Sequence, residues 1–163
     1  MPAATSVGTS GPPDAPPATD ASDRAPSTSP TDSARGPSSS SPGPRELLQA
    51  ANDARLAGHT REAASAFDNL RRHYRNDPRA GLAAFELGRL RLDSLGDPGG
   101  AAEAFADSIA LAPGATFRED AEARLVEALD RAHDAGRCAA ARRGYLARFP
   151  NGLHAASVAA RCP

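Results

Sequence analysis

The feature that most constrains the fold of this chain is a pattern that recurs about every forty residues. Three glycines, Gly58, Gly96 and Gly136, separate apolar stretches and are 38 and 40 residues apart. Apolar residues recur at helical spacing on both sides of each glycine. A repeat of this length with two helices per unit is typical of a helical solenoid.

An alanine that is followed four residues later by an aromatic residue marks the second helix of each unit. The three pairs are Ala63/Phe67, Ala101/Phe105 and Ala141/Tyr145. Residues four apart lie on the same face of a helix, so the alanine leaves a flat spot beside a large ring. We expect the neighbouring helix to approach closely over the alanine while the ring fills the space beside it.

The boundaries of the helices follow from capping residues and breakers. Apolar spacing predicts seven helices in residues 45–163, and no alternating β-branched run predicts a strand. Asp77 and Asp97, each followed by a proline, are expected to cap the start of a helix. Thr60 and Thr116 are expected to cap two further helices. The three inter-helix glycines are expected to end the first helix of each unit as left-handed caps.

The first 44 residues have a different composition from the rest of the chain. They hold ten of the fifteen prolines and contain no Leu, Ile, Phe, Tyr or Trp. Such a segment buries too little apolar surface to offset the entropy of ordering, which is about 1–2 kcal/mol per residue for the backbone. We therefore expect residues 1–44 to be a disordered Pro/Ser/Thr/Ala-rich linker and residues 45–163 to be the folded domain.

Composition also limits the partners of the chain. The net charge is -1, and the charges are scattered, which argues against nucleic acid as a partner. No stretch approaches the roughly 20 apolar residues that a membrane span needs, so direct membrane insertion is not expected. The start MPAATSVGTS has neither a basic nor an apolar run. Either the protein stays in the cytoplasm, or a targeting segment lies upstream in a longer chain.

No pattern for catalysis, for a metal or for a cofactor stands out. The histidines fall at expected turns and helix ends, and none lies at ligand spacing from a cysteine or carboxylate. They are His59, His73, His133 and His154. The glycine-rich stretch GDPGGAA lacks the Lys-Ser/Thr element of a phosphate-binding loop. We interpret the chain as a non-enzymatic protein that needs no cofactor.

The two cysteines are placed for a disulfide. Pro150 lies twelve residues after Cys138 and twelve before Cys162. Antiparallel helices of equal length put the start of one beside the end of the next, so we expect the two sulfurs to be neighbours. The alternative is that they are two unrelated small apolar residues. A disulfide implies an oxidising compartment such as the periplasm.

Residues 45–163 resemble the tetratricopeptide repeat family. In the best unit, Leu87-Gly88 matches the Leu-Gly of the family's first helix, and Ala101, Phe105 and Pro113 match the conserved pattern of its second helix. The first and third units keep Leu47, Gly58, Ala63 and Phe67, and Leu125, Gly136, Ala141 and Tyr145. The period exceeds the family's usual 34 residues.

The stretch RFPNGLHAASVAA is similar to the longer repeats of bacterial envelope proteins. These include the barrel-assembly lipoprotein type and the C-terminal repeats of membrane-bound sigma-factor regulators. The resemblance implies an all-α, right-handed superhelix of about 3.5 antiparallel helical hairpins. It also implies a protein–protein interaction module or scaffold of the cell envelope, with the cytoplasm as the alternative location.

The family binds an extended peptide or a helix in a concave groove that is lined by the first helix of each hairpin. The candidate partner-binding residues implied here are Asn52, Arg55, Glu86, Arg89, Glu127 and Arg131. The family's carboxylate clamp for chaperone tails needs lysine, and this chain has none, so such tails are not expected as partners. Two alternatives remain: the sensory or output domain of a sigma-factor regulator, and a structural fragment that oligomerises by stacking.

Overall fold

The computed structural model describes residues 41–162, and this part of the chain contains seven α-helices and no strand. The helices are α1 (Pro44–Leu56), α2 (Thr60–His73), α3 (Ala80–Asp93), α4 (Pro98–Leu111), α5 (Arg118–Arg131), α6 (Ala135–Arg148) and α7 (Ala155–Ala159). The all-α class and the seven helices are as predicted. The linker expected over residues 1–44 lies mostly outside the described residues. Helix α1 begins at Pro44, which is the last residue of that expected linker.

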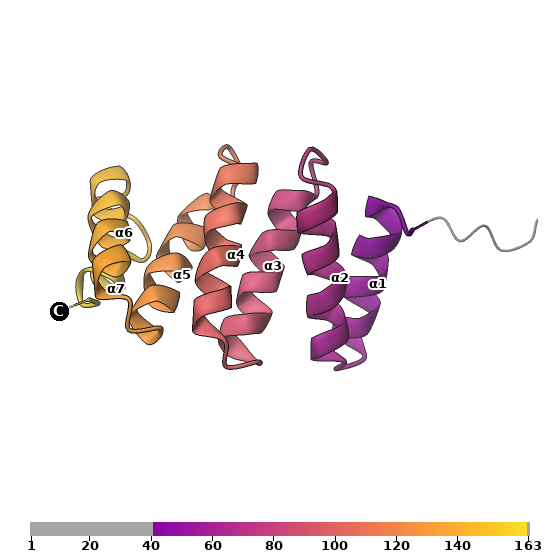
Figure 1. Cartoon of the computed structure of the whole chain (residues 1–163). Coiled ribbons are helices and arrows are strands. Elements are labelled where there is room, and N and C mark those ends of the chain that lie inside the picture. The colour runs from indigo at the N-terminus through magenta and orange to yellow at the C-terminus, as the bar shows by residue number, and fades with distance from the viewer. Residues whose placement is uncertain (1–40, 163) are drawn as a thin grey trace, which may run out of the picture. The chain divides into compact units, whose positions relative to one another are not determined.

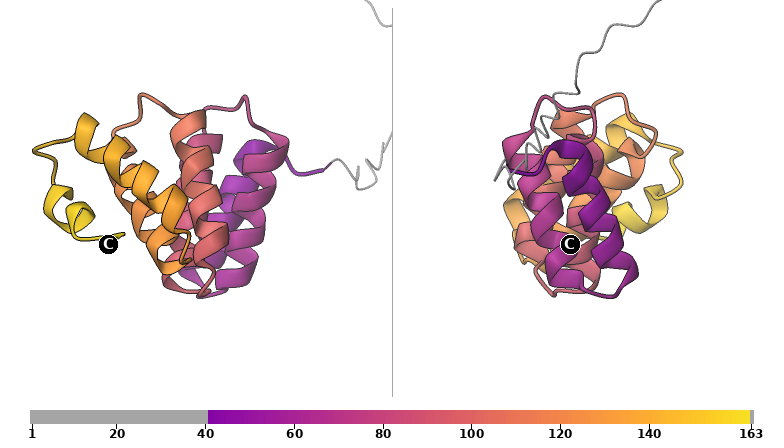
Figure 2. Two further views of the ribbon diagram at one scale, coloured as in Figure 1. Left: turned by 60° about the vertical axis from the view of Figure 1, so that its left-hand side comes forward. Right: turned by 90° about the vertical axis from the view of Figure 1, so that its right-hand side faces the viewer.

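The helices form a two-layered row of antiparallel hairpins, α1/α2, α3/α4 and α5/α6 (Figure 1). Each helix packs against the next one along the chain, and α7 packs against both α6 and α5. The odd-numbered helices make one layer and the even-numbered α2, α4 and α6 the other. The end-on view in Figure 2 shows α1 and α2 side by side, with α7 on the α1 side. The short α7 thus closes the row in the odd-numbered layer.

The alanine–aromatic pairs lie in the core of the hairpin row. Phe67 and Phe105 are fully buried, and so are the alanines four residues before them. Tyr145 is buried as well, while its partner Ala141 is partly buried against the same cluster. One cluster of buried side chains joins α1 to α4, and a second joins α3 to α7. The rings of Phe85, Phe105 and Phe117 meet in the second cluster, with centroids 5.9 and 5.1 Å apart.

Helices α3 and α4 make the tightest hairpin. A Cβ at Gly88 would lie 2.7 Å from the ring of Phe105, so only glycine lets the two backbones approach this closely. At the other end of the pair, a Cβ at Gly81 would meet the side chain of Ala112. The buried Ser108 hydroxyl donates a hydrogen bond of 2.9 Å to the Gly81 carbonyl.

The helix starts agree only in part with the sequence expectations. Asp97 caps α4, and its side chain accepts a hydrogen bond of 2.8 Å from the Gly100 N–H. Asp77 instead caps the turn before α3, because it accepts from the N–H of Arg79 at 2.9 Å and α3 begins later at Ala80. The expectations for Thr60 and Thr116 are wrong: residues His59 and Phe117 stand at the N-caps of α2 and α5, without side-chain caps.

The observed turns after the first helix of each unit change the predicted repeat spacing. Gly58 and Gly96 have φ angles of 78° and 64°, as expected for left-handed turns. Gly136 does not end α5, since it lies inside α6. The left-handed residue of the third unit is His133, with a φ angle of 57°. The true spacing of these turns is therefore 38 and 37 residues, more regular than the glycines alone indicate.

Candidate functional site

Three of the six candidate residues occupy equivalent positions in successive units. Asn52, Arg89 and Glu127 each lie four residues before the last residue of α1, α3 and α5. Their spacing of 37 and 38 residues matches that of the helix ends. The odd-numbered layer therefore presents, at one position per unit, an amide, a cation and an anion. We call these three residues the central row.

The other candidates do not all join this arrangement. Arg131 ends α5 and corresponds to Asp93 in α3 and to Leu56 in α1. Glu86 lies one turn before Arg89 on α3. Arg55 lies one residue before the end of α1, and its counterpart in α3 is the buried Leu92, so this position is not exposed in each unit. Sequence reasoning missed Leu56, although its side chain is 79% exposed at the position that Arg131 occupies.

Glu127 is the most heavily paired residue of the central row. Its carboxylate contacts the guanidinium groups of Arg124 at 2.7 Å, Arg131 at 3.7 Å and Arg161 at 3.6 Å. Arg124 also forms an ion pair with Asp93, which links α5 to α3. Burial works to lower the pKa of Arg124, but the hydrogen bonds and charges of Asp93 and Glu127 outweigh burial and raise it. Glu127 is thus held in a fixed position.

The N-terminal part of the same layer has fewer internal partners. Among the residues that the structure describes, Arg89 pairs only with Glu86, at 3.3 Å, and its side chain is 51% exposed. Within residues 41–162, the side chains of Asn52 and Arg55 form neither a hydrogen bond nor an ion pair. An exposed ion pair such as Glu86–Arg89 contributes about 0–1 kcal/mol, so its members are free to exchange partners. Two of the three units therefore offer polar groups to a ligand.

Charged contacts also lie between the helices of the even-numbered layer. Arg71 of α2 is buried and bonds to Asp68 on its own helix and to Asp107 on α4. Burial works to raise the pKa of Asp68, but hydrogen bonds and charges from Arg71 and Arg72 outweigh it, so this pKa is lowered. No pattern in the sequence predicted this ion pair between α2 and α4. Its role is to hold α2 and α4 together.

A second buried group of polar side chains lies at the C-terminal end. Glu122 of α5 is buried and bonds to Arg118 at 2.9 Å and to Arg148 of α6. The Tyr145 hydroxyl donates to Glu119 at 2.8 Å and accepts from the N–H of His154 at 3.2 Å. Burial and the bond to Glu119 raise the pKa of Tyr145 to about 12.

The histidines lie at turns and helix ends, as expected. His59 and His154 are the N-cap residues of α2 and α7, His73 ends α2, and His133 adopts the left-handed turn after α5. His154 forms an ion pair with Asp120 at 2.7 Å, a contact that the sequence spacing did not indicate. These positions place the four imidazoles at the rims of the hairpin row.

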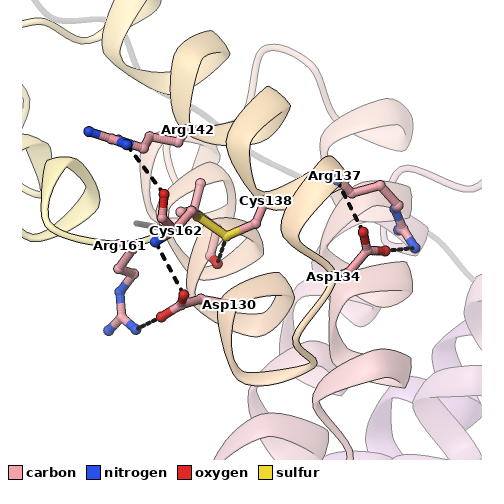
Figure 3. The surroundings of a disulfide bond; sticks show 8 residues. Asp130, Asp134, Arg137, Cys138, Arg142, Arg161 and Cys162 are labelled. Atoms are coloured by element: carbon pink, nitrogen blue, oxygen red, sulfur yellow. Dashed lines mark hydrogen bonds and ion pairs between the residues drawn. A yellow bond between two sulfur atoms is a disulfide. The ribbon is translucent and has the colours of Figure 1, made fainter.

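The expected disulfide is present. Cys138 in the first turn of α6 is bonded to Cys162 just after α7, with their Cα atoms 5.9 Å apart (Figure 3). The backbone N–H of Cys162 also donates to Asp130 of α5 at 3.2 Å. The C-terminal segment is thus fixed to both helices of the third hairpin.

Comparison with protein-family models and with curated proteins finds no match for this chain. None of the helices in residues 41–162 is both long enough and apolar enough to cross a membrane.

Proposed function

We propose that residues 45–163 are a tetratricopeptide-like repeat domain that acts as a non-enzymatic protein–protein interaction module. The partner lies across the odd-numbered layer and contacts the central row. The observation that carries this proposal is that Asn52, Arg89 and Glu127 occupy the same position in three successive units. A row of different side chains at a regular spacing suits an elongated ligand that is read stepwise, such as a peptide segment or a helix.

The side chains of the odd-numbered layer indicate which chemical groups the ligand carries. In the same layer, the N-terminal units offer the exposed Leu56 of α1 and Leu82 of α3, and the half-exposed Arg89. The guanidinium of Arg89 binds a carboxylate in a bidentate manner once it leaves Glu86. At the third unit, Glu127 already has three arginine partners. We therefore expect the ligand to place apolar side chains and a carboxylate against the first two units.

The bacterial cell envelope is the proposed location. A disulfide between Cys138 and Cys162 persists in an oxidising compartment, such as the periplasm, and is uncommon in a reducing cytosol. The resemblance of the stretch RFPNGLHAASVAA to the longer repeats of bacterial envelope proteins agrees with this location. A thiol-blocking mass measurement on protein from its native cells tests it, and two free thiols there would contradict it.

Crosslinked capture with the full chain tests the binding proposal. The variant Arg89→Glu/Arg131→Glu reverses two charges of the odd-numbered layer, and both side chains are about half exposed. The control variant Arg143→Glu makes the same kind of change on the exposed face of α6 in the other layer. We expect the double variant to lose proteins that wild type and the control both retain. An unchanged set of captured proteins would reject the odd-numbered layer as the binding surface.

A further inference from the structure

The C-terminal end of the hairpin row brings three side chains of metal-binding type to one point. The ligand atoms of Asp130, Cys138 and Cys162 all lie within 4.8 Å of one another (Figure 3). They come from α5, from the first turn of α6 and from the segment after α7, so only the folded chain assembles them. Two thiolates and a carboxylate are a ligand set that Zn²⁺ accepts, with a fourth tetrahedral position left for water.

We propose that reduction of the Cys138–Cys162 disulfide converts this point into a zinc site formed by the two sulfurs and the Asp130 carboxylate. A dithiol reductant supplies two electrons and two protons, becomes a disulfide itself and leaves two thiols on the protein. Zn²⁺ then displaces the two thiol protons and binds the thiolates. The disulfide and the metal exclude each other, because both use the same two sulfur atoms. This inference is independent of the proposed partner binding.

Noncovalent contacts keep the ligands together after the sulfur–sulfur bond is broken. The Asp130 carboxylate accepts the Cys162 N–H at 3.2 Å and the Arg161 guanidinium at 3.4 Å. The Arg142 guanidinium donates to the Cys162 carbonyl at 3.4 Å. Cys138 is buried in the first turn of α6, so its backbone position is fixed by that helix. The three ligands therefore stay preorganised in the reduced protein, which lowers the entropy cost of binding the ion.

The surroundings leave access for an ion, with one competitor. Asp130, Cys138 and Cys162 line a shared hollow together with His133 and Asp134. Arg161 competes with Zn²⁺ for Asp130, but a carboxylate has two oxygens and about four lone-pair sites. One oxygen of Asp130 stays with Arg161, and the other, which accepts the Cys162 N–H, keeps a further lone pair for the ion. Asp134 is not part of this group of ligand atoms, and its carboxylate caps α6 by accepting the Arg137 N–H at 3.1 Å.

Metal titration of the full chain tests the proposal directly. The protein is reduced with a water-soluble phosphine, since dithiols bind zinc themselves, and is titrated with Zn²⁺ against a chromophoric chelator. We expect one Zn²⁺ per reduced chain and none per oxidised chain. Co²⁺ in place of Zn²⁺ should give a thiolate charge-transfer band and the visible bands of tetrahedral cobalt. Absence of binding to the reduced wild type would overturn the proposal.

Three variants identify the ligands. Asp130→Asn keeps an oxygen for the Cys162 N–H but loses the charge, and we expect zinc affinity to fall at least about tenfold, the size of loss that removing supporting groups alone produces. Cys138→Ser should abolish the cobalt charge-transfer spectrum of a two-thiolate site. The control Asp134→Asn, on the same hollow, should bind as wild type. Circular dichroism checks that each variant is folded. Equal zinc affinity in Asp130→Asn and wild type would remove Asp130 from the site and overturn the proposal.

Discussion

Gly88 of α3 lies against the ring of Phe105 of α4 so closely that a Cβ at position 88 would be 2.7 Å from the ring. Both residues are fully enclosed in the α3/α4 hairpin, which is the central hairpin of the row. The glycine therefore serves packing and not backbone conformation. This contact sets the distance between the two layers at the middle of the domain.

Gly88→Ala should destabilise the domain. In an open helix position this change stabilises by up to about 1 kcal/mol, but overpacking against a buried ring costs about 1–3 kcal/mol, so the clash wins. The control is Gly144→Ala in α6, where a Cβ meets nothing within 4 Å. In urea unfolding, the free energy of unfolding of Gly88→Ala should be lower than that of wild type. That of Gly144→Ala should be equal to the wild-type value or higher. Equal effects of the two variants would contradict the packing account.

Removing the disulfide should lower stability without changing the fold. The bond spans 24 residues, and closing a loop of this length stabilises by about 3 kcal/mol in the chain-entropy model. We expect Cys138→Ser/Cys162→Ser to unfold at lower urea concentration and to retain its helical circular dichroism. The stability of wild type in reducing buffer should lie between that of oxidised wild type and that of the double variant, because the two thiols still pack. A double variant as stable as oxidised wild type would show that the bond adds nothing.

Arg71→Met should reveal the bridge between α2 and α4. The change leaves the carboxylates of Asp68 and Asp107, which are 20% and 27% exposed, without their buried partner. Partial exposure limits the expected loss to about 1–3 kcal/mol. Arg72→Met is the matched control, because Arg72 pairs with the same Asp68 from a side chain that is 60% exposed. Its effect should stay within about 0.5 kcal/mol.

Tyr145 gives the domain a dependence on high pH. Its pKa is raised from 10.0 to about 12, so the folded state keeps a proton that the unfolded state loses. The stabilisation is therefore complete below pH 10 and is lost as the pH rises towards 12. Tyr145→Phe, which removes the hydroxyl bonded to Glu119, should cost about 1 kcal/mol at pH 7. Difference ultraviolet titration of wild type against this variant measures the pKa of Tyr145. A value near 10 would contradict the raised pKa.

The sequence predicts the helices well because their apolar spacing and the alanine–aromatic pairs depend on short-range pattern. The pairing of Cys138 with Cys162 was also predicted, although the two helices of equal length assumed for it are not observed: α6 has 14 residues, and α7 has 5 and ends before Cys162. The error at Gly136 has a physical cause: glycine is the usual left-handed residue, but His133 adopts that conformation here. Composition alone gives no sign of such an exception, and the register of the third unit was misplaced accordingly.

The ion pairs between helices could not be predicted from the sequence, for a different reason. Arg71 and Asp107 are 36 residues apart, and Arg124 and Asp93 are 31 apart. A chain with nineteen arginines and twenty acidic residues allows many such pairs, and only the packing of the helices selects among them. The same selection decides that Glu127 is enclosed by arginines while Asn52 is left without a partner in residues 41–162.

Site-specific photo-crosslinking is the most direct measurement of the central claim, that a partner lies across the odd-numbered layer. A photoreactive residue is placed at position 89 in the central row, or at position 143 on the exposed face of α6, in full-length protein in its own cells. We predict that position 89 forms a crosslink to one defined partner and that position 143 does not. Crosslinking of the same partner from position 143, with none from position 89, would contradict the account.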